Sequence, residues 1–519
     1  MNQKKTTLSL HNRLLLALSF IEGGSLMATE LLSARMLAPY FGSSLFVWAT
    51  VLALTLGGLT IGYFLGGNLS MHERKDKILL ATLLYSGMMV MIMPFTAQWV
   101  LNFAHHLAFR DAVITAALII IIPPVVGMGM VSPLMVANLD ESAETSGKRA
   151  GLVYAISTTG GITFTFLFGF YVIPYYGLIF PSIITGFVLG LVPAILIFKN
   201  GWKKPGVFLM VFALSGGYFL WQRNLSSNTI NILYQKEGIL GQVMVADIPV
   251  VYEGHVQPER TLFVNRVIQT SFNLNNSKYN DHAYFNVSTD IISGFPEGSE
   301  MLLLGLGGGV LATDAVKKGF KVDAVELDER IIEVASDYFS LPSEVKVFRD
   351  DARRFINKSN KKYDLIVFDL FRGEETPAHV FTAESMSKAR KMLKPGGLAL
   401  INSNGYYRGE IGKGNRSLYK TIRGMGLFTE IYLTDSLEEK SNSVFVFSNS
   451  MDVFEDKIPE YMQNNFVPKD SIDVADAIIL TDQRPVLDYL NEDATRVWRM
   501  GYMAYMRSFY QDYRIPLFN

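Results

Sequence analysis

Seven predominantly apolar stretches follow one another along the first 221 residues of this 519-residue chain, and they constrain its fold more than any other feature. A helix needs about 20 such residues to cross the hydrocarbon core of a bilayer. We predict membrane spans at about 14–37, 45–69, 78–100, 112–138, 151–173, 177–198 and 206–221. A soluble helical core does not supply seven such runs in series. The sequence therefore predicts a multi-pass helical domain over residues 1–222, surrounded by lipid.

The first predicted span contains ionisable side chains, which are costly at bilayer depth and usually face a partner or a wet cavity. Glu22 and Glu30 lie within the span, and Arg35 lies near its end. Two interpretations stay open. Glu30 and Arg35 form a structural ion pair, or the three residues form a polar site for a substrate or a cation.

Glycines in the second predicted span recur every four residues, at Gly58, Gly62 and Gly66. This spacing places them on one face of a helix, where small residues let two helices approach closely. We interpret them as packing residues.

Lysine and arginine gather in alternate loops, which indicates the orientation of a membrane protein because these residues mark the cytoplasmic side. They occur before the first span and after the second, fourth and sixth, at Lys4, Lys5, Arg13, Arg74, Lys75, Lys77, Lys148, Arg149, Lys199, Lys203 and Lys204. We predict a protein of the cell (inner) membrane with a cytoplasmic N-terminus. Seven spans would then place the remainder of the chain outside.

Composition excludes several classes of function. The formal net charge is −1, which argues against a nucleic-acid binder that works by neutralising phosphates. The chain has no cysteine, so disulfides, thiolate catalysis and cysteine–zinc sites are excluded. We predict no metal site.

After about residue 222 the pattern changes to short strands and helices. We expect a small β-rich unit over residues 223–290, a Rossmann-like α/β domain over 291–450 and a helical C-terminal extension over 451–519. Strands are expected near 301–305, 321–327, 344–348, 363–369, 397–402, 428–433 and 443–447. Strands that alternate with helices indicate a mostly parallel sheet covered on both faces.

A glycine-rich loop follows the first strand of this α/β domain. It contains Gly305, Gly307, Gly308 and Gly309, which allow a tight strand-to-helix turn and the close approach of a ligand to the main chain. Glu326 ends the next strand, about twenty residues later, where an acid binds ribose hydroxyls in doubly wound folds. Together they predict a nucleoside site.

Two further acids follow successive strands. Asp351–Ala352 come after the third strand, where an acid can accept a hydrogen bond from the exocyclic amine of a base, and Asp369 comes after the fourth. Ligands of open α/β sheets bind at this carboxyl edge. The loop lacks a clean dinucleotide spacing, so the arrangement fits an S-adenosyl-type nucleoside better than a dinucleotide.

Residues 300 to 404 resemble the spermidine synthase branch of the class I AdoMet-dependent transferases. The resemblance is carried by "GLGGGVL", "VELD", "DDARRF" and "FDLF", with "NRVIQT" ending near Gln269 and "DHAY" containing His282. The apolar half, with "GGLTIGYFLGG", is similar to the fused transporter-like/spermidine synthase proteins. The resemblance implies decarboxylated AdoMet as cosubstrate, an amine or polyamine as acceptor, Asp369 as the base, and Gln269 and His282 near the substrate.

Two departures from that family bear on the acceptor. The soluble enzymes have an aspartate within the glycine loop where this chain has Gly307, and a second aspartate near the place of Arg372. Glu374 or Glu375 could replace the lost carboxylate. A dication needs an anion for each ammonium, so diamine recognition is less supported than nucleoside binding.

Three functions therefore stay open: an aminopropyltransferase, a methyltransferase that uses intact AdoMet on a membrane-borne acceptor, and a non-catalytic nucleoside- or polyamine-binding module coupled to a small transporter. A homodimer stays open as well. The side of the soluble domain is also open, because seven spans place it outside whereas the implied cosubstrate is cytosolic. If the segment 206–221 does not cross, six spans place it inside.

Overall fold

The computed structural model describes residues 10–42, 44–104, 107–139, 146–199, 205–224, 230–252, 254–275, 283–371, 376–513 and 518. The chain divides into two compact units, which we call the helical unit and the sheet unit and describe separately. The helical unit comprises Met1–Ser227, Lys236–Gly241 and Met506–Asn519; the sheet unit comprises Asn228–Gln235 and Gln242–Tyr505.

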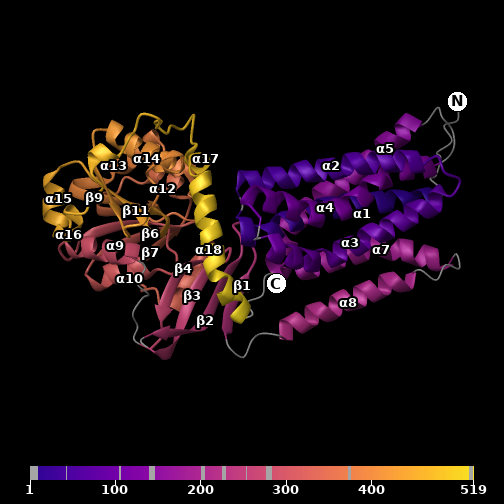
Figure 1. Ribbon diagram of the computed structural model, residues 1–519, viewed down its shortest axis with the longest axis horizontal. Coiled ribbons are helices and arrows are strands. Elements are labelled where there is room, and N and C mark those ends of the chain that lie inside the picture. The colour runs from indigo at the N-terminus through magenta and orange to yellow at the C-terminus, as the bar shows by residue number, and fades with distance from the viewer. Residues whose placement is uncertain are drawn as a thin grey trace. The chain divides into compact units, whose positions relative to one another are not determined.

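Long apolar helices run side by side in the helical unit (Figure 1). They are α1 (Leu10–Phe41), α2 (Leu45–Leu69), α3 (Lys75–Ala104), α4 (Phe109–Asn138), α5 (Ser146–Leu167), the short α6 (Ile173–Tyr176), α7 (Ile179–Lys199) and α8 (Pro205–Asn224), with a π-helical turn, Phe168–Val172, between α5 and α6. Among the described residues, six helices are long and apolar enough to cross a membrane. The seventh predicted span falls on α8, whose apolar stretch, Gly206–Leu220, is shorter.

Close helix packing at the predicted glycines is confirmed. Gly58, Gly62 and Gly66 are all buried on the face of α2 that contacts α4. A Cβ atom at Gly62 would lie 2.5 Å from the carbonyl oxygen of Val126, so only glycine permits this backbone separation. In a membrane such contacts replace the hydrophobic driving force that water supplies elsewhere.

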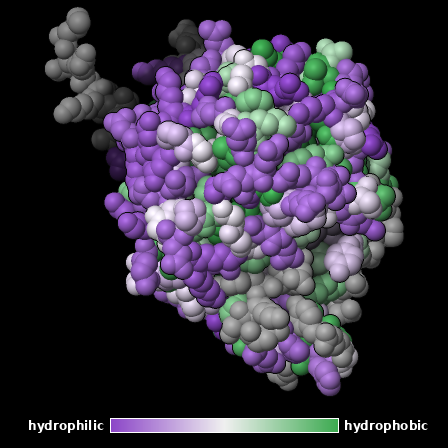
Figure 2. Space-filling view, turned by 90° about the vertical axis from the view of Figure 1, so that its left-hand side faces the viewer, coloured by the Kyte–Doolittle hydropathy of each residue, from purple (hydrophilic) through white to green (hydrophobic). Residues whose placement is uncertain are grey.

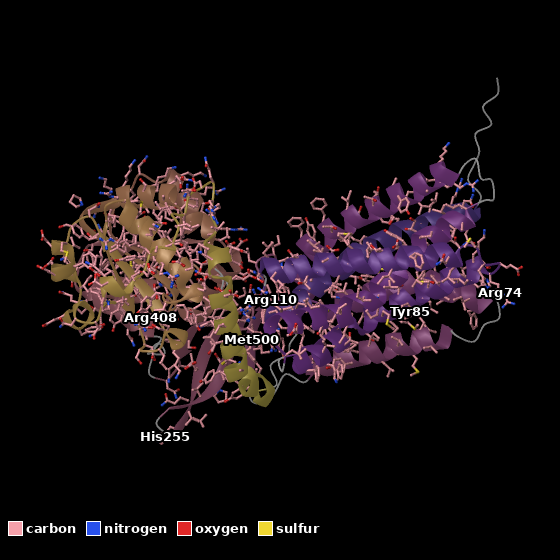
Figure 3. The ribbon with its side chains drawn as sticks, turned by 45° about the horizontal axis from the view of Figure 1, so that its top comes forward. Arg74, Tyr85, Arg110, His255, Arg408 and Met500 are labelled. Carbon is pink, nitrogen blue, oxygen red and sulfur yellow. The ribbon has the colours of Figure 1, made fainter. Side chains whose placement is uncertain are left out.

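Two arginines mark the opposite ends of this bundle. Arg74, in the turn between α2 and α3, and Arg110, in the first turn of α4, are at opposite ends of the helices, with Tyr85 of α3 between them (Figure 3). If the bundle crosses a membrane, these two positions lie near its opposite surfaces.

The sheet unit begins with a small four-stranded sheet in the order β1-β2-β3-β4, where β2–β3 and β3–β4 are antiparallel. Its strands are β1 (Asn231–Lys236), β2 (Val243–Tyr252), β3 (His255–Val264) and β4 (Val267–Asn273). The β3–β4 hairpin turns through Asn265 and Arg266, both with positive φ, as a two-residue turn that matches the strand twist requires.

A seven-stranded sheet follows, in the order β10-β11-β9-β8-β5-β6-β7. Its strands are β5 (Glu300–Leu304), β6 (Lys321–Glu326), β7 (Lys346–Arg349), β8 (Tyr363–Phe368), β9 (Leu393–Asn404), β10 (Phe428–Leu433) and β11 (Asn442–Ser448). The five strands from β9 to β7 are parallel, and β11 pairs antiparallel with both β9 and β10. The chain leaves β5 first toward β6 and later returns to β8, so the topological switch point lies between β5 and β8.

Helices cover both faces of this sheet. They are α9 (Ala283–Ser293), α10 (Val310–Lys317), α11 (Glu329–Phe339), α12 (Ala352–Lys358), α13 (Ala383–Lys391), α14 (Lys413–Gly424), α15 (Asp452–Lys457), α16 (Glu460–Gln463) and α17 (Leu487–Leu490). A further helix, α18 (Glu492–Asp512), follows, and its Arg499 donates to Asn265 O in the β3–β4 turn. Alternate strand residues enter two separate cores: Leu303 packs with α9, α10 and α11, and Leu302 packs with α12, α13 and α14. The predicted Rossmann-like architecture is confirmed.

Hydrophilic side chains cover most of the molecular face drawn in Figure 2, and hydrophobic ones are scattered among them. That face belongs to the end of the sheet unit where α13, α15 and α16 lie in Figure 1. On α2 and α5, by contrast, large apolar side chains such as Leu56 and Phe166 are exposed.

Candidate active site

The glycine loop joins β5 to α10 at the switch point of the sheet. Gly305 has a φ of 93°, and a Cβ atom there would lie 2.0 Å from the carbonyl oxygen of Asp369, so glycine is required. Asp369 N in turn donates to Leu304 O at 2.8 Å. The loop and the end of β8 therefore form one continuous wall at the carboxyl edge of the sheet.

The rest of the loop is held from the small sheet. Gly308 N donates to Thr270 Oγ1 at 2.9 Å, and a Cβ atom on Gly308 would lie 2.6 Å from the Thr270 methyl carbon. Thr270 lies on β4, next to the predicted substrate residue Gln269. Gln269 is half-buried, and its Nε2 donates to Ile268 O at 3.3 Å. The structure thus brings Gln269 to within one residue of the loop.

Glu326 ends β6 with both carboxylate oxygens bound to backbone N–H groups. Leu306 N donates to Oε2 at 3.0 Å, and Asp328 N donates to Oε1 at 2.9 Å. Burial raises the pKa of Glu326, and these N–H donors oppose the rise. The side chain is fixed beside the loop and keeps free lone pairs on each oxygen for further donors such as hydroxyls.

Asp351 is the N-cap of α12, after β7. Its Oδ1 accepts from Arg354 N at 2.9 Å, and its Oδ2 lies 3.0 Å from His379 Nε2. Burial alone would raise the pKa of Asp351, but the His379 and backbone hydrogen bonds outweigh it and lower the pKa. Ala352 follows as the first, buried residue of α12.

Asp369 follows β8 on the opposite side of the loop from Glu326. Asn402 Nδ2, from β9, donates to Asp369 Oδ1 at 2.9 Å, and Asn442 Nδ2, from β11, donates to Asn402 Oδ1 at 2.8 Å. Burial raises the pKa of Asp369 to about 6, and the Asn402 hydrogen bond limits the rise. Two amides in series thus orient a carboxyl that titrates near neutrality.

Tyr284 of α9 brings a buried phenol to Asp369. The side chain is 8% exposed, and its hydroxyl has no hydrogen-bond partner among the described residues. Ser288 Oγ donates to the Tyr284 carbonyl at 2.9 Å. Burial and the charge of Asp369 raise the pKa of Tyr284, so it is neutral and retains a proton to donate. A buried hydroxyl without a partner indicates a position that a ligand completes.

The sheet order places these side chains in one row. Along β8-β5-β6-β7 the strand ends carry Asp369, the glycine loop, Glu326 and Asp351 in that order. The strand order therefore brings these residues to neighbouring strand ends at one edge of the sheet. Chemically, the row offers acceptors for hydroxyls and an amine at one end, and a base with a phenol at the other.

Some predicted site residues lie outside the described residues, namely His282, Arg372, Glu374 and Glu375. Within the described part of the chain, no three His, Cys, Asp or Glu side chains gather in a way that would hold a metal ion.

The predicted membrane polar site is in the helical unit. Glu22 is buried on α1 and Glu30 is half-buried two turns later. Arg35 Nη2 donates to Ile239 O at 2.6 Å, so at least one hydrogen bond of the guanidinium goes to a backbone carbonyl.

Sequence reasoning missed Thr270, Tyr284, Asn402 and Asn442. The segment "DHAY" draws attention to its histidine, and the tyrosine two residues later, Tyr284, was not considered although its side chain is buried. Asn402 could have been predicted from the sequence, because it ends the predicted parallel strand that follows the strand ending at Asp369. Asn442 had none, since its place depends on the antiparallel register in which β11 joins β9.

The strand order, the loop at the switch point and the acids on neighbouring strand ends define the sheet unit as a Rossmann-like domain of the transferase class. Residues 292–407 match the family model of the spermine/spermidine synthase domain. Over these residues the chain is therefore similar to that domain, and the predicted resemblance is confirmed for this part.

Characterised relatives extend the similarity. The chain is 24% identical over 427 residues to polyamine aminopropyltransferase 2 of Aquifex aeolicus, covering 79% of this chain and 82% of that protein. It is 30% identical over 197 residues to an N-terminal histidine N-methyltransferase of Emericella nidulans, covering 34% of this chain and 35% of that protein. Spermidine synthase of Thermotoga maritima aligns with 16% identity and a TM-score of 0.34, over 52% of this chain and 88% of that one. A TM-score this low carries no argument, so the fold rests on the strand order.

Proposed function

We propose that the protein is a membrane-integrated aminopropyltransferase whose sheet unit binds decarboxylated AdoMet. Glu326 would hold the ribose hydroxyls, and Asp351 with the Ala352 backbone N–H would hold the adenine edge. The loop residues Gly305 and Gly307 let the nucleoside lie against the backbone. The residues present fit such a ligand, because acceptors stand where a nucleoside has donors, and because the buried Tyr284 phenol has no partner among the described residues.

The reaction transfers an aminopropyl group to an amine nitrogen. Asp369 would accept a proton from the attacking amine, the new N–C bond forms as the C–S bond of the sulfonium breaks, and neutral methylthioadenosine leaves. The observation that carries the proposal is the Asp369 carboxyl, with its pKa near 6, beside a neutral buried phenol at the switch point. A base is effective when its pKa lies near the working pH.

The acceptor that fits best is an amine or polyamine that needs few anionic partners. Gly307 stands where the related enzymes have an aspartate, and Arg372 adds a positive charge to the sequence near the second lost acid. The relative from Aquifex aeolicus is named as a polyamine aminopropyltransferase.

Methyl transfer from intact AdoMet is the second candidate. It is favoured by the similarity to a protein named as an N-terminal histidine N-methyltransferase. The same nucleoside crevice would serve it, and the base Asp369 would again accept the proton of the attacking group.

We place the helical unit in the cell membrane with six crossings and a cytoplasmic N-terminus. The six long apolar helices support this number. An even number of crossings puts the sheet unit on the cytoplasmic side, where the proposed cosubstrate is made.

Purified full-length protein with decarboxylated AdoMet or AdoMet, each with a panel of amines, tests the proposal by mass spectrometry of the products. We expect aminopropylated amine and methylthioadenosine; methylated product with AdoMet alone would favour the second candidate, and neither product would contradict both.

Calorimetry with methylthioadenosine tests nucleoside binding separately. Glu326→Gln should weaken binding about 10- to 100-fold, the range for losing hydrogen bonds to a charged group. The matched control is Glu329→Gln on α11, an exposed glutamate whose partner is Arg349. Equal affinities in the two variants would contradict the role of Glu326.

A further inference from the structure

A buried carboxylate lies within the first membrane helix. Glu22 is 2% exposed, and its position on α1 is about 18 Å along the helix axis from Leu10, at 1.5 Å per residue. The hydrocarbon core of a bilayer is about 30 Å thick, so this depth is far from either helix end. The proposed transferase chemistry does not use this group.

The carboxylate lacks a counter-charge in the described part of the chain. Its hydrogen-bond partner there is Ser157 of α5, whose Oγ donates to Glu22 Oε2 at 3.2 Å. No ion pair to Glu22 is formed by any described lysine, arginine or histidine. An ionised carboxylate out of water is unstable without a cation, so a neutral hydroxyl alone does not compensate it.

The α1–α5 contact is built around this point. A Cβ atom on Gly23 would lie 2.1 Å from the Ser157 carbonyl oxygen, and one on Gly160 would lie 2.0 Å from the Phe20 carbonyl oxygen. Glycines on both helices therefore bring the backbones together and set the Ser157 hydroxyl against Glu22. The arrangement is a fixed set of oxygen atoms and not a chance contact of a long side chain.

A second hydroxyl at this level has no partner. Ser25 is 0% exposed, and its Oγ makes no hydrogen bond among the described residues. Ser25 lies three residues after Glu22, so the two side chains share a face of α1. Its carbonyl oxygen is already used, because Thr29 Oγ1 donates to it at 2.7 Å. An orphan buried hydroxyl beside an uncompensated carboxylate indicates that something else binds here.

The surrounding ionisable groups do not supply a charge. Tyr63 of α2 interacts electrostatically with Glu22, and Tyr154 of α5 interacts with Tyr63, but both side chains are exposed and neither is a basic group. The remaining charged residues of the helices packed on α1 lie at or near helix ends, namely Lys75, Asp76 and Lys77 of α3, Arg110 and Asp111 of α4, Lys148 and Arg149 of α5, and Lys199 of α7.

We propose that Glu22, Ser25 and Ser157 form a binding site for a small monovalent cation, either a proton or a sodium ion. Carboxylate and hydroxyl oxygens are ligands for both, and ionisable side chains inside membrane bundles commonly mark ion pathways. The cation supplies the charge that the bundle lacks and completes the bonding of Ser25. The helical unit is then a cation-responsive element and not only an anchor.

Infrared difference spectroscopy of the full-length protein in phosphatidylcholine liposomes tests the site. If the cation is a proton, acidification without sodium should produce the C=O stretch of a protonated carboxylic acid. If it is sodium, exchange of choline for sodium at constant pH should shift the carboxylate stretch. In either case one component of the signal should be missing in Glu22→Gln and present in Glu30→Gln, a matched change on the same helix, while the bands of other carboxyls remain in both.

The proposal would be overturned if the wild type and Glu22→Gln gave the same infrared signals. It would also be overturned if the wild type showed no change either on acidification or on replacement of choline by sodium. Ser157→Ala tests the same site if Glu22→Gln does not fold, because this variant keeps the Glu22 carboxylate. It should shift the midpoint of the pH or sodium response at least several-fold, and an unchanged midpoint would remove Ser157 from the site.

Discussion

Asp369 is a partly buried carboxyl with its pKa raised to about 6, so its protonation affects catalysis and stability in opposite directions. Activity should fall as the pH falls through about 6, because the base is protonated. The raised pKa means that folding favours the protonated form. The stabilisation of the fold by the protonated Asp369 carboxyl is fully present below the usual carboxyl pKa of about 3.9. It is lost as the pH rises through about 6.

Asp369→Asn should therefore abolish transfer and raise the free energy of unfolding at neutral pH by about 3 kcal/mol. The amide can still bond to Asn402 and carries no charge. Thermal unfolding of the full chain at neutral pH and in acid below the usual carboxyl pKa measures this, with no gain expected in acid. Wild-type turnover by the variant would contradict the role of Asp369 as the base.

Tyr284→Phe should lower transfer activity without loss of stability. The phenol oxygen has no hydrogen-bond partner among the described residues, so its removal leaves none unpaired and stabilises the fold by up to about 1 kcal/mol. Tyr363→Phe is the contrasting change, because the Tyr363 hydroxyl donates to Asp323 Oδ2 at 2.8 Å. That variant should cost about 1.5–3 kcal/mol in unfolding measurements. A Tyr284→Phe protein that is fully active would show that the phenol does not serve the reaction.

At the scale of elements, α2 contains one glycine in close contact with α4, Gly62, and one with free space around it, Gly67. Gly62→Ala would place a Cβ atom 2.5 Å from the Val126 carbonyl oxygen, whereas nothing lies within 4 Å of a Cβ atom at Gly67. We expect Gly62→Ala to destabilise the helical unit by about 1–3 kcal/mol, the cost of overpacking. Gly67→Ala should be neutral or slightly stabilising, since alanine is the better helix former. Unfolding temperatures in detergent compare the two, and equal values would contradict the close α2–α4 contact.

The pattern of elements was largely predictable from the sequence because spans and buried strands carry strong periodic signals. All seven predicted strands of the large sheet are present. β9 begins at Leu393, four residues before its predicted start. The prediction began too late because the segment "KPGG" is typical of a turn. In the structure Leu393 pairs with Tyr363, and the register shifts between Tyr363 and Leu365.

The site was predictable only where it follows strand ends. Glu326 and Asp369 were found because the carboxyl ends of parallel strands meet at one edge. Tyr284 reaches Asp369 from a helix that precedes the sheet, and Asn442 reaches Asn402 through antiparallel pairing. Both depend on contacts between segments far apart in the chain, which local pattern does not encode.

At the scale of the whole molecule, the side of the sheet unit can be tested by labelling because the native chain contains no cysteine. Ser436→Cys provides an exposed position in the sheet unit, Glu73→Cys one in the turn between α2 and α3, and Ala108→Cys one before α4. With six crossings and a cytoplasmic N-terminus, an impermeant maleimide should label Ala108→Cys in intact cells. It should label the other two only after lysis. Labelling of Ser436→Cys without lysis would show that α8 crosses the membrane.

The chain does not finish one unit before it begins the other. After the first stretch of the sheet unit it contributes Lys236–Gly241 to the helical unit, and it ends there again with Met506–Asn519, where Phe518 is buried in the apolar core. A single cleavage of the chain between α8 and β1 would therefore not separate the two units completely. The fragment would carry two segments deprived of their partners, and the membrane part would lose a piece of its own core. Extraction from the lipid and inactivation of the transferase are thus expected to be linked events, so detergent choice should govern catalytic half-life as much as solubility.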